Sequence, residues 1–576
     1  MFLPSPIGIL IFFCKKVVKI TNGLESRVMK FSAYDIVLPL VGTDEQQIEG
    51  YALLVSGLYG AVDVVKKEDA DKLQAGNLAG LSPALRERLL LRGHITRKDE
   101  AGELADLKLL SRIHKIIPGR SGVGLVIMPT YDCNFRCPYC FEQHRLKKGQ
   151  NWLDSTMSDE IMEAVFNSLK DYKARGYVLS HCTFYGGEPF LAKNYALVKK
   201  IADKCRELDL SISAITNGYD LETYLDFLEE YKVGGLQVTV DGTAELNDRR
   251  RLHKDGLPTY DRILKNVELA LQRGAAISLR VNVGKENLHG MKDLVDDLKA
   301  RGFIAKEEAR VAEEKELQKT DPQAKTKRGR FSYYFKATND DAHPEKNIRE
   351  QDIIDEMMKM GFTAEEAVAR QSQYTPMWNR LCVLFKQDSY PDFNPTYCGA
   401  EQGMMVVDPF GKVYSCWDVV GKDDMVTGFA VPGMNRFCWN FSKAKWRTRT
   451  VDLMEACQGC PYALICRGGC ASRAFNEHGN YFRESCGEVK EIIAFTVSRV
   501  AGKEWENRCA AMAAGAWDRD RCAEELTLSL AGPVSRLTEA ERETIMATRS
   551  QKEVFEIVKA SGLFPDFGSG KIEKAE

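Results

Sequence analysis

The sequence has little net charge and no long apolar run, and each shortage excludes a class of function. Its 80 lysines and arginines nearly balance its 82 aspartates and glutamates over 576 residues, so nothing suggests a nucleic-acid partner. The apolar run near the N-terminus, in MFLPSPIGILIFFCKKVVKI, lacks the basic start and cleavage site of a signal peptide and is too short for a membrane helix. We therefore expect a cytoplasmic protein with no membrane partner.

Cysteine is the exception, with 17 residues. Three of them, Cys133, Cys137 and Cys140, stand at C-x3-C-x2-C spacing in the run PTYDCNFRCPYCFEQH. A 4Fe-4S cluster is normally held by four cysteine thiolates, so a triplet with no fourth cysteine nearby leaves one iron open to a chelating small molecule. The amino and carboxylate groups of S-adenosylmethionine (SAM) suit that role.

Two other interpretations of the triplet are a zinc site and three buried thiols. Zinc usually takes two C-x2-C pairs or a mixture of cysteine and histidine, and only His144 stands at ligand spacing here. Buried thiols would have no reason to adopt this spacing. The triplet therefore favours a cluster with one open iron.

An aromatic residue, Tyr139, directly precedes the third cysteine, and the segment CTFYGGEPFL follows further along. Both segments resemble the radical SAM superfamily, namely its C-x3-C-x-aromatic-C motif and its GGEP motif, which accepts a hydrogen bond from the SAM amino group. The resemblance implies that the three cysteines bind the catalytic cluster. Asn217 would contact the ribose or methionine of SAM and Arg280 its carboxylate; the alternatives are a turn asparagine and a solvated arginine. The full set of implied cofactor contacts is Tyr139, Gly186, Gly187, Glu188, Pro189, Asn217 and Arg280.

Strand-like runs alternate with helical patterns after the triplet, as in LSISAITNGYDL followed by LETYLDFLEEYK, and TYDRILKNVELALQRG followed by AISLRVNVG. Such alternation favours parallel βαβ units and an α/β fold. The resemblance implies a partial (β/α)6, TIM-like barrel over residues 121–302, with the cluster loop at the carboxyl ends of the strands. We expect residues 303–390 to form a charged insertion and bridge. Part of it should be exposed or mobile because it has no apolar period, namely the stretch ARVAEEKELQKTDPQAKTKRGRFSYYFKATNDDAHPEK.

Three segments within residues 391–490, CGAEQGMMVVDPFGKVYSC, CQGCPYALICRGGC and ESCGEV, carry seven more cysteines. Their order resembles the SPASM domain, a cysteine-rich C-terminal extension of radical SAM enzymes that holds two auxiliary 4Fe-4S clusters. The alternatives are a structural zinc ribbon and a disulfide scaffold, and disulfides fit a large chain without an export signal poorly. The resemblance implies ligands of the first auxiliary cluster at Cys398, Cys416 and Cys470, and of the second at Cys457, Cys460, Cys466 and Cys486.

One position departs from sulfatase-maturing relatives, which carry another cysteine where this chain has Met404. The first auxiliary cluster would then have an open iron, able to bind a substrate thiolate or amide, or would recruit Cys438 or Cys382. No catalytic base is identified, since Asp418 is offset by one residue from the acid that some SPASM enzymes hold. The remaining cysteines are expected to be ordinary thiols: Cys14, Cys182, Cys205, Cys509 and Cys522.

Residues 29–120 are expected to form a separate small α+β unit. The strand-like runs SAYDIVLPLV and EGYALLVSGLYGAVDVV precede three helical patterns, and the unit resembles the winged-helix-like element that captures a leader peptide as an added strand. Capping of the barrel is the alternative. We expect residues 1–28 to be a non-native or disordered extension ahead of a start at Met29, or else a peripheral membrane anchor. We expect residues 491–576 to form a helical C-terminal extension.

Together these features predict a radical SAM oxidoreductase that uses a 5′-deoxyadenosyl radical to modify a ribosomally synthesised precursor peptide by a crosslink, thioether or related oxidation. Its cofactors would be SAM and three 4Fe-4S clusters, and its partners the precursor peptide and a reductant such as flavodoxin or ferredoxin. A sulfatase maturase that forms formylglycine is the first alternative. A non-catalytic iron-sulfur electron carrier or scaffold is the second, and the GGEP and TNG segments count against it.

Overall fold

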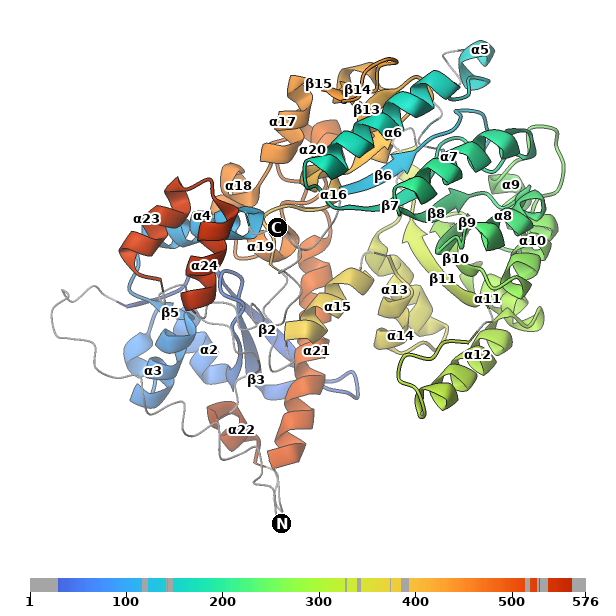
Figure 1. Ribbon diagram of the computed structural model, residues 1–576. Coiled ribbons are helices and arrows are strands. Elements are labelled where there is room, and N and C mark those ends of the chain that lie inside the picture. Colours follow the sequence, from blue (N-terminus) through green and yellow to red (C-terminus); the bar gives the residue numbers. More distant parts are fainter. Residues whose placement is uncertain are drawn as a thin grey trace.

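A computed structural model gives the arrangement of most of the chain (Figure 1). The expected N-terminal extension, residues 1–28 with Cys14, lies outside the described residues. The described ranges are 29–116, 123–140, 142, 149–326, 329–338, 343–372, 374–384, 393–512, 518–525, 528 and 537–561.

Six parallel strands form the centre of the molecule, in the order β11-β10-β9-β8-β7-β6. Apolar side chains alternate along these strands; in β10, for example, Ile277, Leu279 and Val281 are buried. This alternation confirms the predicted α/β core, a large sheet rich in parallel strands. The strands are β6 (Val123–Ile127), β7 (Leu179–Phe184), β8 (Ser211–Thr216), β9 (Gly235–Thr239), β10 (Ala276–Val283) and β11 (Arg330–Ala337).

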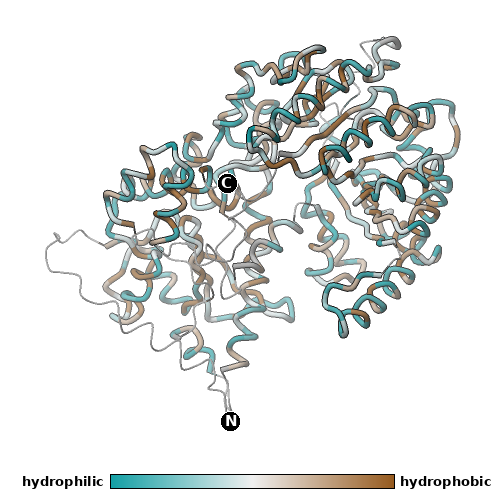
Figure 2. The backbone as a smooth tube through the Cα atoms, viewed as in Figure 1, coloured by the Kyte–Doolittle hydropathy of each residue, from teal (hydrophilic) through white to brown (hydrophobic). Residues whose placement is uncertain are grey.

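Helices between these strands cover the outer face of the sheet, as Figure 1 shows. Each presents one apolar side to the strands; in α10 the buried side includes Ile263, Leu264 and Val267. Figure 2 shows hydrophobic residues gathered along the strands and alternating with hydrophilic ones along the helices. The helices of this part are α5 (Gln150–Leu153), α6 (Asp159–Ala174), α7 (Tyr195–Glu207), α8 (Leu225–Glu230), α9 (Ala244–Arg250), α10 (Tyr260–Gln272), α11 (Met291–Ala300) and α12 (Phe303–Gln318).

The segment after residue 302 forms regular secondary structure at its start, where we expected an exposed insertion or mobile loop, although most of its first helix is exposed. It contains α12 and then β11, which pairs in parallel with β10 as the sixth strand of the sheet. The helix was missed because only Phe303 and Arg310 of α12 are buried, so its sequence has almost no apolar period. The bridge that follows is helical as well, with α13 (Glu350–Lys359), α14 (Ala364–Ala369) and α15 (Tyr374–Leu384).

The cysteine-rich segment extends the same sheet on its other side. Strand β12 (Met405–Val407) pairs in parallel with β6, and an antiparallel series continues through β13 (Lys412–Tyr414), β14 (Gly428–Phe429) and β15 (Cys438–Trp439). The cluster loop after β6 and the cysteine-rich segment therefore start from adjacent strands. The helices of the cysteine-rich segment are α16 (Gly399–Gln402), α17 (Phe441–Thr448), α18 (Glu455–Gln458), α19 (Ala463–Cys466) and α20 (Ala471–His478).

The N-terminal unit has the expected small sheet and three helices. Its antiparallel sheet has the order β2-β3-β4, and a short pair, β1 with β5, lies beside it. The strands are β1 (Lys30–Phe31), β2 (Asp35–Val41), β3 (Gln47–Ser56), β4 (Val62–Lys66) and β5 (Ile95–Thr96), and the helices are α2 (Lys67–Gln74), α3 (Pro83–Arg92) and α4 (Glu100–Ile116).

The described part of the C-terminal extension consists mainly of helices and lies against the N-terminal unit (Figure 1). Arg542 forms an ion pair with Asp106 of α4 at 2.7 Å, and the backbone nitrogen of Leu528 donates to the carbonyl oxygen of Val62 in β4 at 3.1 Å. The N-terminal unit and the described part of the C-terminal extension therefore fold together. The helices are α21 (Val489–Met512), α22 (Arg519–Glu525), α23 (Glu539–Ala547) and α24 (Gln551–Ser561).

Short 3-10 turns connect many of these elements. In the part of the chain that the structure describes, no helix is both long and apolar enough to cross a membrane. The 3-10 turns are η1 (Leu78–Gly80), η3 (Ala192–Asn194), η4 (Leu221–Tyr224), η5 (Pro344–Lys346), η6 (Trp417–Val419), η7 (Asp423–Met425) and η8 (Val451–Leu453).

Candidate functional site

The cysteine triplet lies in the loop that follows β6, at the carboxyl end of the parallel strands. All three thiols are half-buried. The backbone nitrogen of Cys140 donates to the carbonyl oxygen of Cys137 at 3.1 Å, and the sulfur of Cys133 accepts from the backbone nitrogen of Phe135 at 3.3 Å. Burial is the main cause that raises the pKa of Cys137 to about 11, and it raises the pKa of Cys133 further. The loop therefore holds three thiols at the edge of the sheet where barrel enzymes have their active sites.

The GGEP turn packs directly on this cluster loop. Gly186 has a φ of +124°, and a Cβ there would lie 2.7 Å from the carbonyl oxygen of Thr130. A Cβ at Gly187 would overlap the carbonyl oxygens of Tyr131 and Asp132. The structure shows that these glycines allow close approach of the turn to the cluster loop.

Glu188 joins the GGEP turn to the TNG turn. Its carboxylate is buried and accepts hydrogen bonds from the Thr216 hydroxyl at 2.6 Å, the backbone nitrogen of Asn217 at 2.6 Å and that of Phe190 at 2.9 Å. Burial raises the pKa of Glu188 to about 7, although these hydrogen bonds lower it. The Asn217 amide in turn donates to Asn134 of the cluster loop at 2.6 Å. Three separate motifs thus form one hydrogen-bonded unit.

Tyr139 is fixed on the other side of the triplet. Its hydroxyl donates to Asp241 and accepts from the Arg251 guanidinium at 3.0 Å, and the Arg250 guanidinium lies 5.0 Å from the centre of its ring. Burial raises the pKa of Tyr139 well above its usual value. Its ring is therefore held in one orientation by residues that follow β9.

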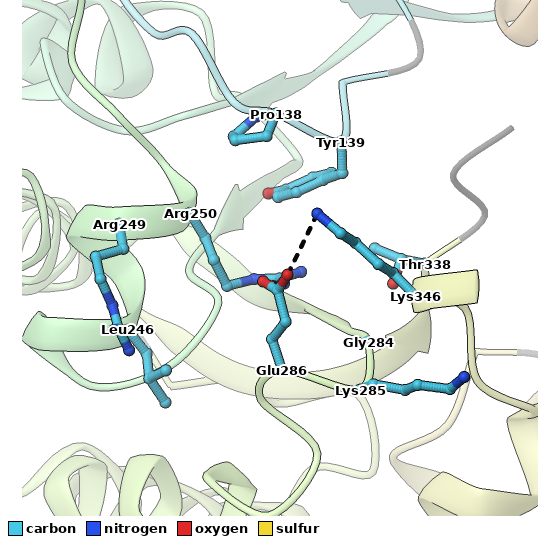
Figure 3. A pocket seen from close by; sticks show the side chains of 10 residues that line it. All are labelled: Pro138, Tyr139, Leu246, Arg249, Arg250, Gly284, Lys285, Glu286, Thr338 and Lys346. Atoms are coloured by element: carbon cyan, nitrogen blue, oxygen red, sulfur yellow. Dashed lines mark hydrogen bonds and ion pairs between the residues drawn. The ribbon is translucent and has the colours of Figure 1, made fainter. Parts of the chain in front are cut away.

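A cavity of about 280 Å³ opens beside Tyr139 at the carboxyl ends of β9, β10 and β11 (Figure 3). Figure 3 shows Lys346 paired with Glu286, a contact of 3.4 Å, and Arg250 lies 3.1 Å from the same carboxylate. The rim carries more positive than negative side chains, so it suits a small polar molecule with negative groups. The lining residues are Pro138, Tyr139, Leu246, Arg249, Arg250, Gly284, Lys285, Glu286, Thr338 and Lys346.

Arg280, Asp418 and Tyr185 lie where the barrel meets the cysteine-rich segment. The Arg280 guanidinium donates to Asn282 at 2.8 Å, and its charge acts on both Asp418 and Tyr185. Asp418 is accessible to solvent, yet neighbouring protein atoms desolvate it enough to raise its pKa, against the charges of Arg473 and Arg280. Arg280 is half-buried, and its contact with the SAM carboxylate stays a prediction.

The seven C-terminal cysteines gather into two neighbouring sets of free thiols. The charges of Cys398 and Cys470 both act on Cys416. Likewise, Cys457 has the other three of its expected set as electrostatic neighbours. The structure thus brings together Cys398, Cys416 and Cys470 in one set, and Cys457, Cys460, Cys466 and Cys486 in the other.

The donors of both sets are cysteine thiols. Among the described residues, no group of three or more histidine, cysteine or acidic side chains could hold a single metal ion. A 4Fe-4S cluster is normally held by cysteine thiolates, so the chemistry of these donors fits such clusters.

Arg449 organises both sets, and sequence reasoning missed it. Its side chain is fully buried and forms an ion pair with Glu401 at 2.5 Å, three residues after Cys398. The same guanidinium donates to the carbonyl oxygens of Gly468 at 3.0 Å and Gly469 at 2.8 Å, and also to those of Tyr481 and Arg483 before Cys486. A lone arginine carries no sequence signal for this role.

Met404, where relatives have a cysteine, is half-buried beside the apolar cluster that includes Cys416. Of the two cysteines expected to substitute, Cys438 lies in β15 with its thiol 3.3 Å from the sulfur of Met434, and Cys382 lies in α15. Whether either joins the first set stays a prediction.

Comparison with known proteins agrees with this site. Residues 127–298 match the family model of the Radical SAM superfamily. An S-adenosylmethionine-dependent nucleotide dehydratase of Psychrobacter lutiphocae is 27% identical over 175 residues, 29% of this chain and 57% of that protein, so the match spans little more than half of this relative. A serine-type anaerobic sulfatase-maturating enzyme of Bacteroides thetaiotaomicron is 29% identical over 151 residues, 25% of this chain and 34% of that enzyme.

One solved structure, native anSMEcpe with bound AdoMet and the Cp18Cys peptide, has 19% sequence identity and a TM-score of 0.49, covering 66% of this chain and 98% of that one. The family match runs from the last residue of β6 into α11 and includes the cysteine triplet and both the GGEP and TNG turns. Residues 127–298 of this chain are a radical SAM domain.

Proposed function

We propose that this radical SAM protein modifies a ribosomally synthesised precursor peptide, installing a crosslink, thioether or related oxidation. The observation that carries the proposal is the position of Tyr185, which has both Cys140 of the triplet and Asp418 of the cysteine-rich segment as electrostatic neighbours. Its ring lies 6.1 Å from that of Trp417, the residue after Cys416. A substrate held here would be within reach of both the cluster loop and the first auxiliary set.

The residues of this chain divide the work. Cys133, Cys137 and Cys140 would hold the catalytic cluster, while Glu188 and Asn217 keep the turns around it in order. With SAM bound, a reduced cluster there would supply the one electron that cleaves SAM into methionine and a 5′-deoxyadenosyl radical, chemistry that reaches carbon–hydrogen bonds that acids and bases cannot activate. The two further thiol sets would hold auxiliary 4Fe-4S clusters that accept an electron from the substrate or anchor it.

The N-terminal unit would supply peptide recognition by strand addition. Its sheet has two edge strands, β2 and β4. Part of the β4 edge is already engaged, because Leu528 of the C-terminal extension donates to Val62. A leader peptide would therefore take the remainder of one edge or displace this contact. The alternative role, capping the barrel, has less support because the contacts of the unit run to the C-terminal extension and the cysteine-rich segment.

Formylglycine formation on a sulfatase is the second candidate, favoured by the sequence similarity to sulfatase-maturating enzymes. Met404 counts against it, since the first thiol set lacks a cysteine that we expect in such enzymes.

Anaerobically reconstituted protein, dithionite and SAM provide the test, with two synthetic peptides compared. One is encoded by a short open reading frame next to the gene, and the other carries a sulfatase active-site cysteine or serine. The proposal predicts deoxyadenosine release and a mass change on the first peptide alone. Modification of the sulfatase peptide alone would favour the second candidate. If the protein neither cleaves SAM nor modifies either peptide, both candidate functions are contradicted.

A further inference from the structure

The N-terminal unit contacts the loop that carries the second thiol set. The hydroxyl of Tyr34, at the start of β2, donates to the backbone carbonyl oxygen of Gln458, which lies between Cys457 and Cys460. Tyr34 is buried, with 3% of its surface exposed. A residue far from the cysteines in sequence thus reaches inside their C-x2-C loop.

A second contact touches the same loop from the same side. Gly57, in the turn between β3 and β4, donates its backbone N–H to the carbonyl oxygen of Tyr34 at 2.9 Å. A Cβ at Gly57 would overlap the carbonyl oxygen of Pro461, the residue after Cys460. Because only glycine fits there, the turn and the cysteine loop are packed without a gap.

The segment leading into the loop is held by the same unit. Helix α4 packs against η8, whose Val451 is fully buried, and η8 is followed directly by α18, which contains Cys457. The N-terminal unit therefore contacts the second thiol set before Cys457, between its first two cysteines and after Cys460.

We propose that Tyr34 is a positioning residue of the second auxiliary cluster, and that the N-terminal unit sets the reduction potential of that cluster by orienting and shielding the Cys457–Cys460 loop. This inference rests on the proposed function, since it assumes that the second set holds a 4Fe-4S cluster. Groups that hydrogen-bond around the ligands fix their orientation, and the potential of a cluster depends on hydrogen bonding and on solvent exposure.

A link between peptide binding and electron transfer follows. If a peptide binds the N-terminal unit and shifts Tyr34 or Gly57, the potential of the second cluster changes, and by reciprocity the redox state of that cluster changes the affinity for the peptide. Recognition and the acceptance of an electron would then be coupled through one hydrogen bond and one glycine contact.

The test is an anaerobic redox titration of the reconstituted full chain, followed by electron paramagnetic resonance, on Tyr34→Phe and on Tyr51→Phe. Tyr51 is the matched control, because its hydroxyl donates to Asp520 at 2.7 Å on the far side of the same unit from the cysteine loop. We expect Tyr34→Phe to shift the midpoint potential of one cluster and leave the others in place, and Tyr51→Phe to shift none. Unchanged potentials in Tyr34→Phe would overturn the inference.

Gly57→Ala is the second variant, because it displaces the turn while keeping the Tyr34 hydroxyl. It should shift the same midpoint, and a loss of thermal stability without any shift would reduce both contacts to domain packing and overturn the inference. The iron content of the wild type distinguishes failure of this inference from failure of the proposed function. About twelve irons per chain are expected for three clusters, and about four would contradict the auxiliary clusters themselves, whatever the variants do.

Discussion

The backbone nitrogen of Glu188 donates to the carbonyl oxygen of Asp132 at 2.7 Å, which joins the GGEP turn to the residue before the first cysteine of the triplet. The turn can approach this closely only because Gly187 has no side chain. The GGEP motif therefore shapes the cluster loop as well as any ligand that the loop receives.

Gly187→Ala should disrupt this contact. The new methyl group would overlap two backbone carbonyl oxygens, which cannot turn away as a side chain could. We therefore expect the free energy of unfolding to fall by at least the roughly 1–3 kcal/mol that overpacking usually costs. SAM cleavage and iron at the triplet should both fall. Gly235→Ala is the control, because a Cβ there meets nothing within 4 Å. Normal SAM cleavage by Gly187→Ala would show that the contact is dispensable.

Arg449→Met should release both auxiliary thiol sets. The substitution leaves Glu401 as a buried charge without its partner and frees the carbonyl oxygens of Gly468 and Gly469, and breaking a buried pair in this way costs about 3–5 kcal/mol. Reconstituted protein should keep the iron of the triplet and lose most of the remainder. Exposed Arg447, two residues earlier, provides the control as Arg447→Met. Full iron content in Arg449→Met would contradict the organising role.

The N-terminal unit should lose stability as the pH rises. His94 is fully buried between Asp35 and Asp63, 2.9 Å from each. Burial alone would lower the pKa of His94, but the two carboxylates raise it to about 9. Because this exceeds the unfolded value of about 6.5, the contribution is fully present below about pH 6.5 and is lost as the pH rises through about 9.

Melting temperatures of the wild type and of His94→Gln, measured at about pH 6.5 and about pH 9.5, check this prediction. The variant should be less stable at the lower pH by roughly 3–5 kcal/mol, and the difference between the two proteins should shrink at the higher pH. A difference that does not change with pH would show that His94 is neutral in the folded protein.

Deletion of residues 29–116 tests how far recognition and chemistry separate. From the sequence we would expect SAM cleavage without the peptide to survive, because none of the proposed ligands lies in this unit. Because Tyr34 and Gly57 contact the loop of the second thiol set, the deletion should also expose that set. We therefore predict retained SAM cleavage, lost peptide binding and a fall of about four irons. Fluorescence anisotropy with the labelled peptide, a deoxyadenosine assay and an iron assay measure the three, and unchanged peptide affinity would contradict the recognition role.

The core of the fold could be predicted from sequence because its strands alternate apolar residues next to recognisable motifs, as in β8 before Thr216 and Asn217. Helix α12 could not, since only Phe303 and Arg310 of it are buried and its charged pattern is that of a solvated segment. Strand β11 has the aromatic residues of a strand and was missed because it follows this charged stretch. The role of Arg449 depends on contacts with backbone groups up to 34 residues away, and such contacts have no residue pattern. The close approach of Gly187 to the carbonyl oxygens of Tyr131 and Asp132 appears only in three dimensions.

The central claim is that Cys133, Cys137 and Cys140 hold the cluster that cleaves SAM, and replacing all three by alanine tests it most directly. Iron content and deoxyadenosine formation are measured on the reconstituted variant beside the wild type. We predict the loss of about a third of the iron and of all SAM cleavage, with the auxiliary clusters retained. SAM cleavage that persists in this variant would contradict the assignment.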